Sequence, residues 1–310
     1  MPKQDIIVIG ASAGGVETLQ GLVSQFPADL PAAILVVMHL HARSRSFLPE
    51  ILSRAGRLPA HHAADGVPIE SGRIYVAPPD HHLVVERGHI HLGVGPKEQH
   101  QRPCINVTLR SAAFAYGERL AGVILTGTLD DGTAGLWEVK RRGGVAVVQR
   151  PDDALFPSMP LSALREIEVD YTVPLAEMGA LLTRLARGEG EQKRIEVERP
   201  AMEPAITDLT CPDCRGTIWE VPRGNGSEFR CRVGHTYSAK SMMAEHYATQ
   251  EKALYAAVVA LEEGASLANR LAERLGEDLA HQFRAEARDR QDEAETLRKV
   301  LRDRQPFSLD

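Results

Sequence analysis

The stretch that decides the fold is Asp5-Ile-Ile-Val-Ile-Gly-Ala-Ser-Ala-Gly-Gly15, an apolar run that ends in a glycine-rich turn. A helical pattern follows over residues 16–26, so the stretch predicts a buried strand joined to a helix by a tight turn. Ser12 lies in that turn, where it faces the amide groups at the start of the helix, and such groups can stabilise negative charge. The sequence therefore predicts a reactive serine at the carboxyl end of a strand.

Two further apolar runs end close to residues that can assist a serine. Residues 32–38 lead directly into His39, and residues 121–127 end four residues ahead of Asp131. The carboxyl ends of parallel strands share one edge of a sheet, where α/β folds place their sites. We therefore expect Ser12 to meet a histidine base and an orienting aspartate there, as in a serine hydrolase.

The residues alone leave alternatives open. His41 is as available as His39, and either Asp130 or Asp131 can orient an imidazole while the other caps the next helix. The turn around Ser12 also has the small residues of a dinucleotide-binding loop. Ser12, however, occupies the position of that loop's middle glycine and would crowd a pyrophosphate.

Composition restricts the class of protein. The chain has 310 residues, 43% of them hydrophobic, and can bury one substantial core beside a smaller module. Its formal charge of −6 argues against a dominant nucleic-acid surface. No apolar run reaches the roughly 18 residues that a membrane span needs, and no signal segment precedes the first strand. The few cysteines suit a reducing compartment, so we expect a cytoplasmic protein.

Strand and helix patterns alternate from residue 5 to about 185, which predicts a doubly wound, mostly parallel α/β sheet. Residues 83–94 are typical of an antiparallel hairpin, which we place at an edge of that sheet. The expected parts are a sheet domain at 1–186, a solvated linker at 187–208, a cysteine-bearing module at 209–238 and a helical hairpin at 239–310.

The second cluster of chemically reactive residues is Cys211-Pro-Asp-Cys214 with Cys231 and His235. A short knuckle and a pair after a hairpin can surround a tetrahedral ion, as in a zinc ribbon. Because these ligands leave no open position, we predict one structural zinc and no cofactor for catalysis. A redox pair at Cys211 and Cys214 would leave Cys231 and His235 without a role; His246 is an alternative fourth ligand.

Six motifs occur in the order of a known family. They are Ile9-Gly-Ala-Ser-Ala-Gly-Gly15, Met38-His-Leu40, Arg102-Pro103, Arg110-Ser-Ala-Ala113, Leu125-Thr-Gly127 and Asp131-Gly132. Over residues 5–180 the chain resembles the catalytic domain of the chemotaxis protein-glutamate methylesterases, the CheB family. The resemblance implies hydrolysis of γ-glutamyl methyl esters on chemoreceptor helices, and in some members deamidation of receptor glutamines.

The resemblance also implies roles for particular residues. It assigns the nucleophile to Ser12, the base to His39, the orienting acid to Asp131 and the oxyanion donor to the backbone amide of Thr128. We add Arg102 and Arg110 as candidate contacts for an acidic receptor helix, with plain surface charges as the alternative reading. Cys104 we interpret as an ordinary small residue.

The chain departs from the family pattern at three places. Ala13 replaces the usual threonine after the nucleophile, and Thr128-Leu129 replaces the usual Met-Gly ahead of the aspartate. The first strand begins near Asp5, so we expect no receiver domain that controls the site in cis. The rival hypothesis is a non-catalytic adaptor that binds receptor helices, another helical partner or a second copy of the chain through its C-terminal half.

Overall fold

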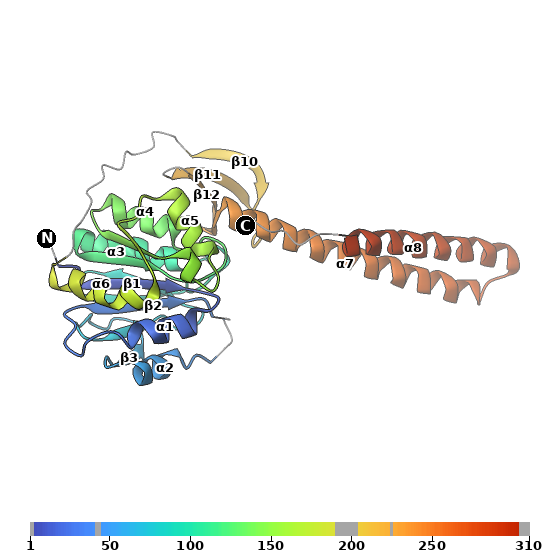
Figure 1. Ribbon diagram of the computed structural model, residues 1–310. Coiled ribbons are helices and arrows are strands. Elements are labelled where there is room, and N and C mark those ends of the chain that lie inside the picture. Colours follow the sequence, from blue (N-terminus) through green and yellow to red (C-terminus); the bar gives the residue numbers. More distant parts are fainter. Residues whose placement is uncertain (1–2, 41–44, 190–203, 224–225, 304–310) are drawn as a thin grey trace. The chain divides into compact units, whose positions relative to one another are not determined.

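The structure is a computed structural model that describes residues 3–40, 45–189, 204–223 and 226–303 (Figure 1). His41 and most of the predicted linker lie outside the described residues. The main element is a seven-stranded sheet with the strand order β3-β4-β2-β1-β7-β8-β9. Its strands are β1 (Ile6–Ala11), β2 (Ala33–Met38), β3 (Ala60–His62), β4 (Ile74–Val76), β7 (Leu120–Ile124), β8 (Val145–Gln149) and β9 (Tyr171–Val173).

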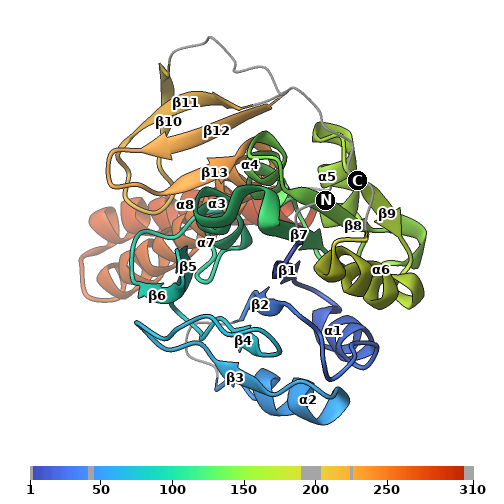
Figure 2. The same ribbon diagram turned by 90° about the vertical axis from the view of Figure 1, so that its left-hand side faces the viewer.

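Every pairing in this sheet is parallel, and helices cover both of its faces (Figures 1 and 2). Strand β1 is buried at every position because side chains on both faces pack against helices. The two faces of the sheet have separate hydrophobic cores. Ile7 and Ile9 belong to the core that α1, α2 and α6 cover, and Ile6 and Val8 belong to the core that α3, α4 and α5 cover. These helices are α1 (Gly15–Val23), α2 (Leu48–Ala55), α3 (Ile105–Tyr116), α4 (Thr133–Arg141), α5 (Ser158–Glu166) and α6 (Leu175–Arg187).

Strand β1 lies between β2 and β7, so the chain builds the sheet outward in both directions from it. This order confirms the predicted doubly wound fold. The order also changes direction at β1, and in such sheets the carboxyl ends of the strands at this point are the usual place for a site.

The predicted hairpin forms but has a different place. Strands β5 (His82–Glu86) and β6 (His89–Gly93) make a separate two-stranded sheet, so the expectation of a hairpin at the edge of the main sheet was wrong. It is held to α3 by side-chain bonds to its backbone: Thr108 Oγ1 donates to the Leu83 carbonyl at 2.7 Å, and Ser111 Oγ accepts from the Val85 amide at 3.0 Å. The pattern predicted the local hairpin, whereas its docking depends on these distant hydroxyl groups.

The cysteine-bearing module is an antiparallel sheet with the order β10-β11-β12-β13. Its strands are β10 (Ala205–Thr210), β11 (Thr217–Arg223), β12 (Gly226–Cys231) and β13 (Thr236–Ser238), so the first strand starts inside the predicted linker. Contacts group Met1–Ser241 into one compact unit, which contains both this module and the main sheet.

Met242–Asp310 forms a second unit, which contains most of a helical hairpin. Helices α7 (Ala239–Ala272) and α8 (Glu277–Asp303) pack through small buried residues, among them Ala265, Ala268 and Ala287. Small side chains let the two backbones approach closely, and the predicted helical hairpin is confirmed. Within the described part of the chain, none of the helices has the length and apolar character that crossing a membrane requires.

A buried ion pair links helix α4 to the residue that precedes β9. Lys140 Nζ lies 2.6 Å from Asp170 Oδ1, both side chains are almost fully buried, and Asp170 Oδ2 also accepts from the Ala146 amide at 2.8 Å. We predict that Asp170→Ala lowers the free energy of unfolding by about 3–5 kcal/mol, because it removes the buried carboxylate that is paired with the Lys140 charge.

Urea unfolding measures this effect. The control is Arg150→Ala, which breaks an exposed pair with Asp152 and should change the stability by at most about 1 kcal/mol. Equal effects of the two substitutions would contradict the importance of the buried pair.

Candidate active site and metal centre

Ser12 follows β1 directly and is held by the neighbouring strand end. Its amide donates to the Thr126 carbonyl at 3.0 Å, and its own carbonyl accepts from the Gly15 amide at 2.9 Å. A Cβ atom on Gly127 would lie 2.9 Å from Ser12 Cβ and 2.1 Å from Met159 Sδ. Only glycine at position 127 therefore lets the β7 loop come this close to the serine.

His39 lies between Ser12 and Asp131. Its Nδ1 is 3.1 Å from Ser12 Oγ, and its Nε2 is 2.7 Å from Asp131 Oδ2. The carboxylate only accepts, so Nε2 carries the ring proton and Nδ1 is left to accept from the serine hydroxyl. The ring nitrogens thus have the reverse assignment from chymotrypsin, where Nε2 faces the serine. The three residues predicted from the strand ends are brought together as a hydrogen-bonded chain.

The carboxylate of Asp131 is 2% exposed and is surrounded by donors. The Ile105 amide donates to Oδ2 at 2.7 Å, and the Asn106 amide donates to Oδ1 at 3.0 Å. Both amides belong to the first turn of α3, whose positive end stabilises a nearby negative charge. The Gly132 amide at 2.8 Å and the Cys104 thiol at 3.2 Å complete the set on Oδ1.

These contacts decide the charge of the site. Burial by itself raises the pKa of Asp131, but the hydrogen bonds from His39 and the Ile105 amide, with the charge interaction with His39, outweigh it. The pKa of Asp131 therefore lies below its ordinary value, and the group is ionised at neutral pH. A fixed negative charge is what orients an imidazole and stabilises it when it gains a proton.

Some residues of the site were not found from the sequence. Cys104, expected to be an ordinary small residue, donates to Asp131. Asn106 Oδ1 accepts from the Gly132 amide at 3.0 Å and the Gly135 amide at 2.7 Å, which fixes the start of α4. Thr126 Oγ1 donates to the Ala13 carbonyl at 3.0 Å and accepts from the Phe156 amide at 2.8 Å. These are buried polar contacts between loops, and no local motif reports them.

The loop after β7 also separates the two adjacent aspartates. Asp131 faces His39, whereas Asp130 Oδ1 accepts from Ser238 Oγ at 2.8 Å. Burial raises the pKa of Asp130 to about 6. Thr128, the predicted oxyanion donor, is exposed and lies one residue beyond Gly127, beside the serine turn.

The two candidate substrate-binding arginines are engaged inside the protein. Arg102 donates to the single oxygen Asp80 Oδ1 from both Nε, at 3.0 Å, and Nη2, at 2.7 Å. Arg110 lies 2.5 Å from Glu98 and 4.0 Å from Glu228. Both guanidinium groups hold loops together here, and a role in binding a receptor helix stays a prediction.

The predicted metal ligands also converge. One ligand atom from each of Cys211, Cys214, Cys231 and His235 lies within 4.8 Å of all the others. Cys214 Sγ and Cys231 Sγ are 3.6 Å apart, and His235 Nδ1 lies 3.7 Å from Cys211 Sγ and 3.5 Å from Cys231 Sγ. Zinc–ligand bonds of about 2.0–2.3 Å in a tetrahedron place ligand atoms about 3.5–3.8 Å apart. The residues therefore fit a zinc ion through three thiolates and Nδ1.

Neighbouring groups support this cluster. Tyr237 is fully buried, its hydroxyl lies 3.5 Å from Cys211 Sγ, and it donates to Asp213 Oδ2 at 2.6 Å. The amide of Cys231 donates to the His235 carbonyl at 3.0 Å, which closes the second knuckle. Four protein ligands are typical of a structural zinc site rather than a catalytic one.

Comparisons with known proteins agree on the sheet domain. The sequence model of the family described as CheB methylesterase matches residues 7–182. The chain is similar to the catalytic domain of the Thermotoga maritima CheB methylesterase in its crystal structure, with a TM-score of 0.56 and 32% identity. That match covers 60% of this chain and 99% of the other.

Two curated relatives show different extents of similarity. A putative protein-glutamate methylesterase/protein-glutamine glutaminase of Leptospira interrogans is 36% identical over 190 residues, 61% of this chain and 98% of the relative. The protein-glutamate methylesterase/protein-glutamine glutaminase 2 of Methanosarcina mazei is 33% identical over 192 residues. That match covers 59% of this chain and 52% of the relative, so the chain spans about half of the Methanosarcina protein.

The geometry of the cysteine cluster generates a prediction about metal content. We expect one zinc per chain in protein purified without added metal, and loss of that zinc in Cys211→Ser, because three ligands hold zinc far less tightly than four. Elemental analysis by mass spectrometry measures the stoichiometry. The matched control is Cys104→Ala, which removes the cysteine outside the cluster and should keep the zinc; a metal content that Cys211→Ser leaves unchanged would contradict the site.

Proposed function

The chain belongs to the CheB methylesterase family, a family of carboxylic ester hydrolases, and on this premise we propose that Ser12, His39 and Asp131 hydrolyse glutamyl methyl esters on chemoreceptor helices. The observation that carries the proposal is the continuous hydrogen-bonded chain from Ser12 Oγ through both ring nitrogens of His39 to Asp131. The family match supplies the class of substrate.

The proposed reaction starts with attack of Ser12 Oγ on the ester carbonyl carbon while His39 Nδ1 takes the hydroxyl proton. Asp131 stabilises the imidazolium, and the Thr128 amide donates to the oxyanion of the tetrahedral intermediate. When the intermediate collapses, the carbon–oxygen bond to the methoxy group breaks and His39 returns the proton, so methanol leaves. A water molecule, deprotonated by His39, then attacks the acyl carbon, the bond from that carbon to Ser12 Oγ breaks, and His39 returns the proton to Ser12 as the glutamate leaves.

The same steps extend to a glutamine side chain, with ammonia as the leaving group, and we include deamidation in the proposal. An amide is the harder substrate because its nitrogen must be protonated before it leaves, a task that falls to His39 as general acid. The expected independence of this chemistry from a receiver domain in cis stays a prediction.

Two exposed apolar residues, Leu155 and Phe156, form an apolar lip beside the serine turn that suits a helical protein substrate. Leu155 is 72% exposed and Phe156 is 40% exposed, and both lie within 3.3 Å of where a Cβ on Gly14 would be. Thr126 fixes this segment through the Phe156 amide, so the lip is held next to the serine turn. We propose that it contacts the apolar side chains next to the glutamyl ester.

The catalytic proposal predicts that Ser12→Ala lowers the kcat of methanol release from methylated receptor by about 10³-fold or more, because the nucleophile is lost while the fold is kept. Enzyme-coupled methanol detection measures the rate. Ser24→Ala, at an exposed serine just past α1, is the matched control and should leave kcat unchanged. Equal slow release by wild type and Ser12→Ala would favour the non-catalytic adaptor instead.

A second candidate role concerns the helical hairpin. Tyr255, Val259 and Leu267 are spaced by multiples of four on α7 and are each more than half exposed. Large apolar groups at this spacing form a strip that suits contact with another helix. We propose that this strip helps bring the enzyme to a receptor bundle, with another helical protein or a second copy of the chain as the competing partners.

We predict that the double substitution Val259→Glu and Leu267→Glu reduces turnover of intact receptor arrays several-fold and leaves the hydrolysis of a small soluble ester unchanged. Charges on the strip oppose burial of an apolar contact. Ser266→Glu with Asn269→Glu, two exposed positions elsewhere on α7, is the charge-matched control. Unchanged array turnover would remove the strip from substrate delivery, and sedimentation velocity identifies a second copy as the partner if the wild type self-associates.

A further inference from the structure

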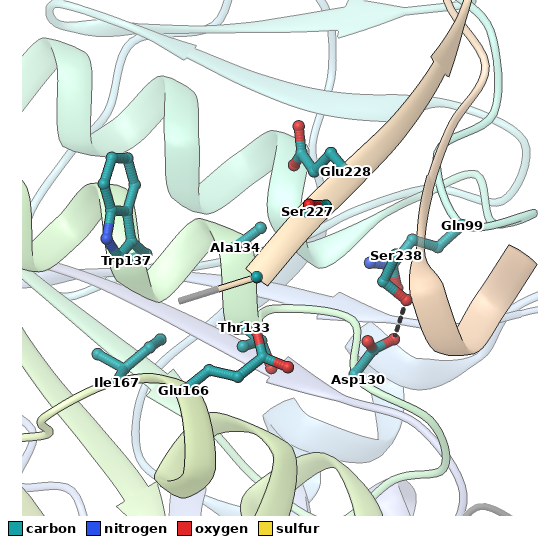
Figure 3. A pocket seen from close by; sticks show the side chains of 11 residues that line it. Gln99, Asp130, Thr133, Ala134, Trp137, Glu166, Ile167, Ser227, Glu228 and Ser238 are labelled. Carbon is teal, nitrogen blue, oxygen red and sulfur yellow. Dashed lines mark hydrogen bonds between the residues drawn. The ribbon is translucent and has the colours of Figure 1, made fainter. Parts of the chain in front are cut away.

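The segment that follows the metal cluster reaches the loop that carries Asp131. Ser238, the last residue of β13, donates from Oγ to Asp130 Oδ1 at 2.8 Å (Figure 3). Asp130 is 3% exposed and directly precedes Asp131 in the chain. A hydrogen bond to a buried carboxyl group at this position restrains the backbone that holds the orienting acid.

A second contact reaches the same loop from α7. Lys240 Nζ donates to Ser162 Oγ at 2.8 Å, and Ser162 Oγ donates to the Leu129 carbonyl at 3.2 Å. Ser158 Oγ donates to the same carbonyl at 3.1 Å. Leu129 has a φ of 62°, a left-handed conformation that costs energy for a leucine and persists only where its surroundings hold it. The Leu129 peptide is therefore held by two serines of α5, and Lys240 from outside the sheet domain bonds one of these serines.

Other residues of the module contact the sheet domain near Ser238. The Gln99 amide donates to the Thr236 carbonyl at 2.5 Å, and Arg110 of α3 lies between Glu98 and Glu228. Thr236 directly follows the metal ligand His235, and Ser238 lies two residues further on. The conformation that the cluster imposes on Cys231–His235 thus determines where the Ser238 hydroxyl lies.

The module and the sheet domain do not pack closely everywhere in this region, and apolar side chains such as Trp137 and Ile167 line the gap beside polar ones. A cavity of about 40 Å³ separates β12 and β13 from α4 and α5 (Figure 3). Its lining includes the carboxyl groups of Asp130, Glu166 and Glu228 and the hydroxyl of Thr133. Since packing around Ser238 is incomplete, its bond to Asp130 is a specific restraint and not a by-product of a tightly packed interface.

We propose that Ser238 and Lys240 are positioning residues, which hold the loop of Thr128 and Asp131 in its reactive geometry through Asp130 and through Ser162 with Leu129. The zinc-binding module then sets the turnover number of the hydrolase, although it supplies no group that touches the substrate. This inference rests on the proposed esterase activity for its kinetic consequence, and on the hydrogen bonds alone for its structural one.

The kinetic test uses the full-length, zinc-loaded protein and p-nitrophenyl acetate, a small ester that needs no docking surface. In the double variant Ser238→Ala and Lys240→Met, kcat should fall about tenfold or more while KM changes by less than about twofold, because small displacements of catalytic groups cost rate rather than binding. Ser238→Thr with Lys240→Arg keeps both donors and should recover most of the rate. Removing zinc with a chelator should reproduce the fall.

Two controls separate positioning from a general loss of structure. Ser227→Ala changes another serine that lines the cavity, and Lys252→Met changes an exposed lysine on the same helix; both should leave kcat unchanged. The rates are divided by the folded fraction measured by circular dichroism. An unchanged kcat in the double variant, or an equal fall in the controls, would overturn the proposal.

A readout that needs no turnover keeps this proposal separate from the esterase proposal. In protein labelled with ¹⁵N at histidine and threonine, the His39 Nε2 proton and the Thr128 amide should shift in the double variant and not in the two controls. Unchanged resonances would overturn the positioning role even if the enzyme is active. Shifted resonances in a protein that hydrolyses no ester would support the restraint and refute only the esterase.

Discussion

The burial of one carboxylate, that of Asp131, is the constraint on which the rest of the site depends. Moving an ionised group out of water costs several kcal/mol, so its oxygens must find donors within the protein. The first turn of α3 supplies two amides, and His39 supplies a third donor. Helix α3 must therefore begin where it does. Gly10 is required there as well, because a Cβ on it would lie 2.4 Å from Ile105.

Parallel strand geometry explains how residues far apart in sequence come to serve one reaction. Strands β2, β1 and β7 are neighbours, so His39, Ser12 and the loop of Asp131 leave the sheet at the same edge. The sheet fixes their positions to within a few ångströms, and the hydroxyl of Thr126 then links the serine turn to the loop that ends β8. The strands bring the three reactive residues close together, and the buried polar contacts orient their side chains.

The parts that the sequence predicted correctly are those that depend on local patterns. Apolar runs and glycine turns are visible in the chain, so the strands and the place of Ser12 followed from them. The choices of His39 over His41 and of Asp131 over Asp130 did not follow from local patterns, because each pair is chemically identical, and only the family resemblance made them. In the structure, the turn of the loop decides which aspartate faces the imidazole. The donors around Asp131 could not be predicted either, since two of them are backbone amides of α3. Cys104 had no feature that distinguished it from a packing residue.

Contacts across the molecule were the least predictable. Two apolar runs on either side of an Arg87-Gly88 turn predicted the β5–β6 hairpin. Its docking on α3 depends on Thr108 and Ser111, which the helical pattern treats as ordinary polar positions. Ser238 and Lys240 likewise look like the unremarkable start of a helix. Their partners are set by how the module folds around its cluster, and that geometry has no signature in spacing or composition.

The separation of 108 residues between Asp130 and Ser238 has a consequence for biosynthesis. At a translation rate of about 5–20 residues per second, the complete sheet domain, whose last helix ends at Arg187, emerges from the ribosome roughly 3–10 s before Ser238. During that interval the three reactive residues can already meet, yet the loop between them is held only from the side of the sheet. Metal capture by the module would then act as a late step of maturation, so that the cell's zinc supply influences how much newly made enzyme reaches full activity.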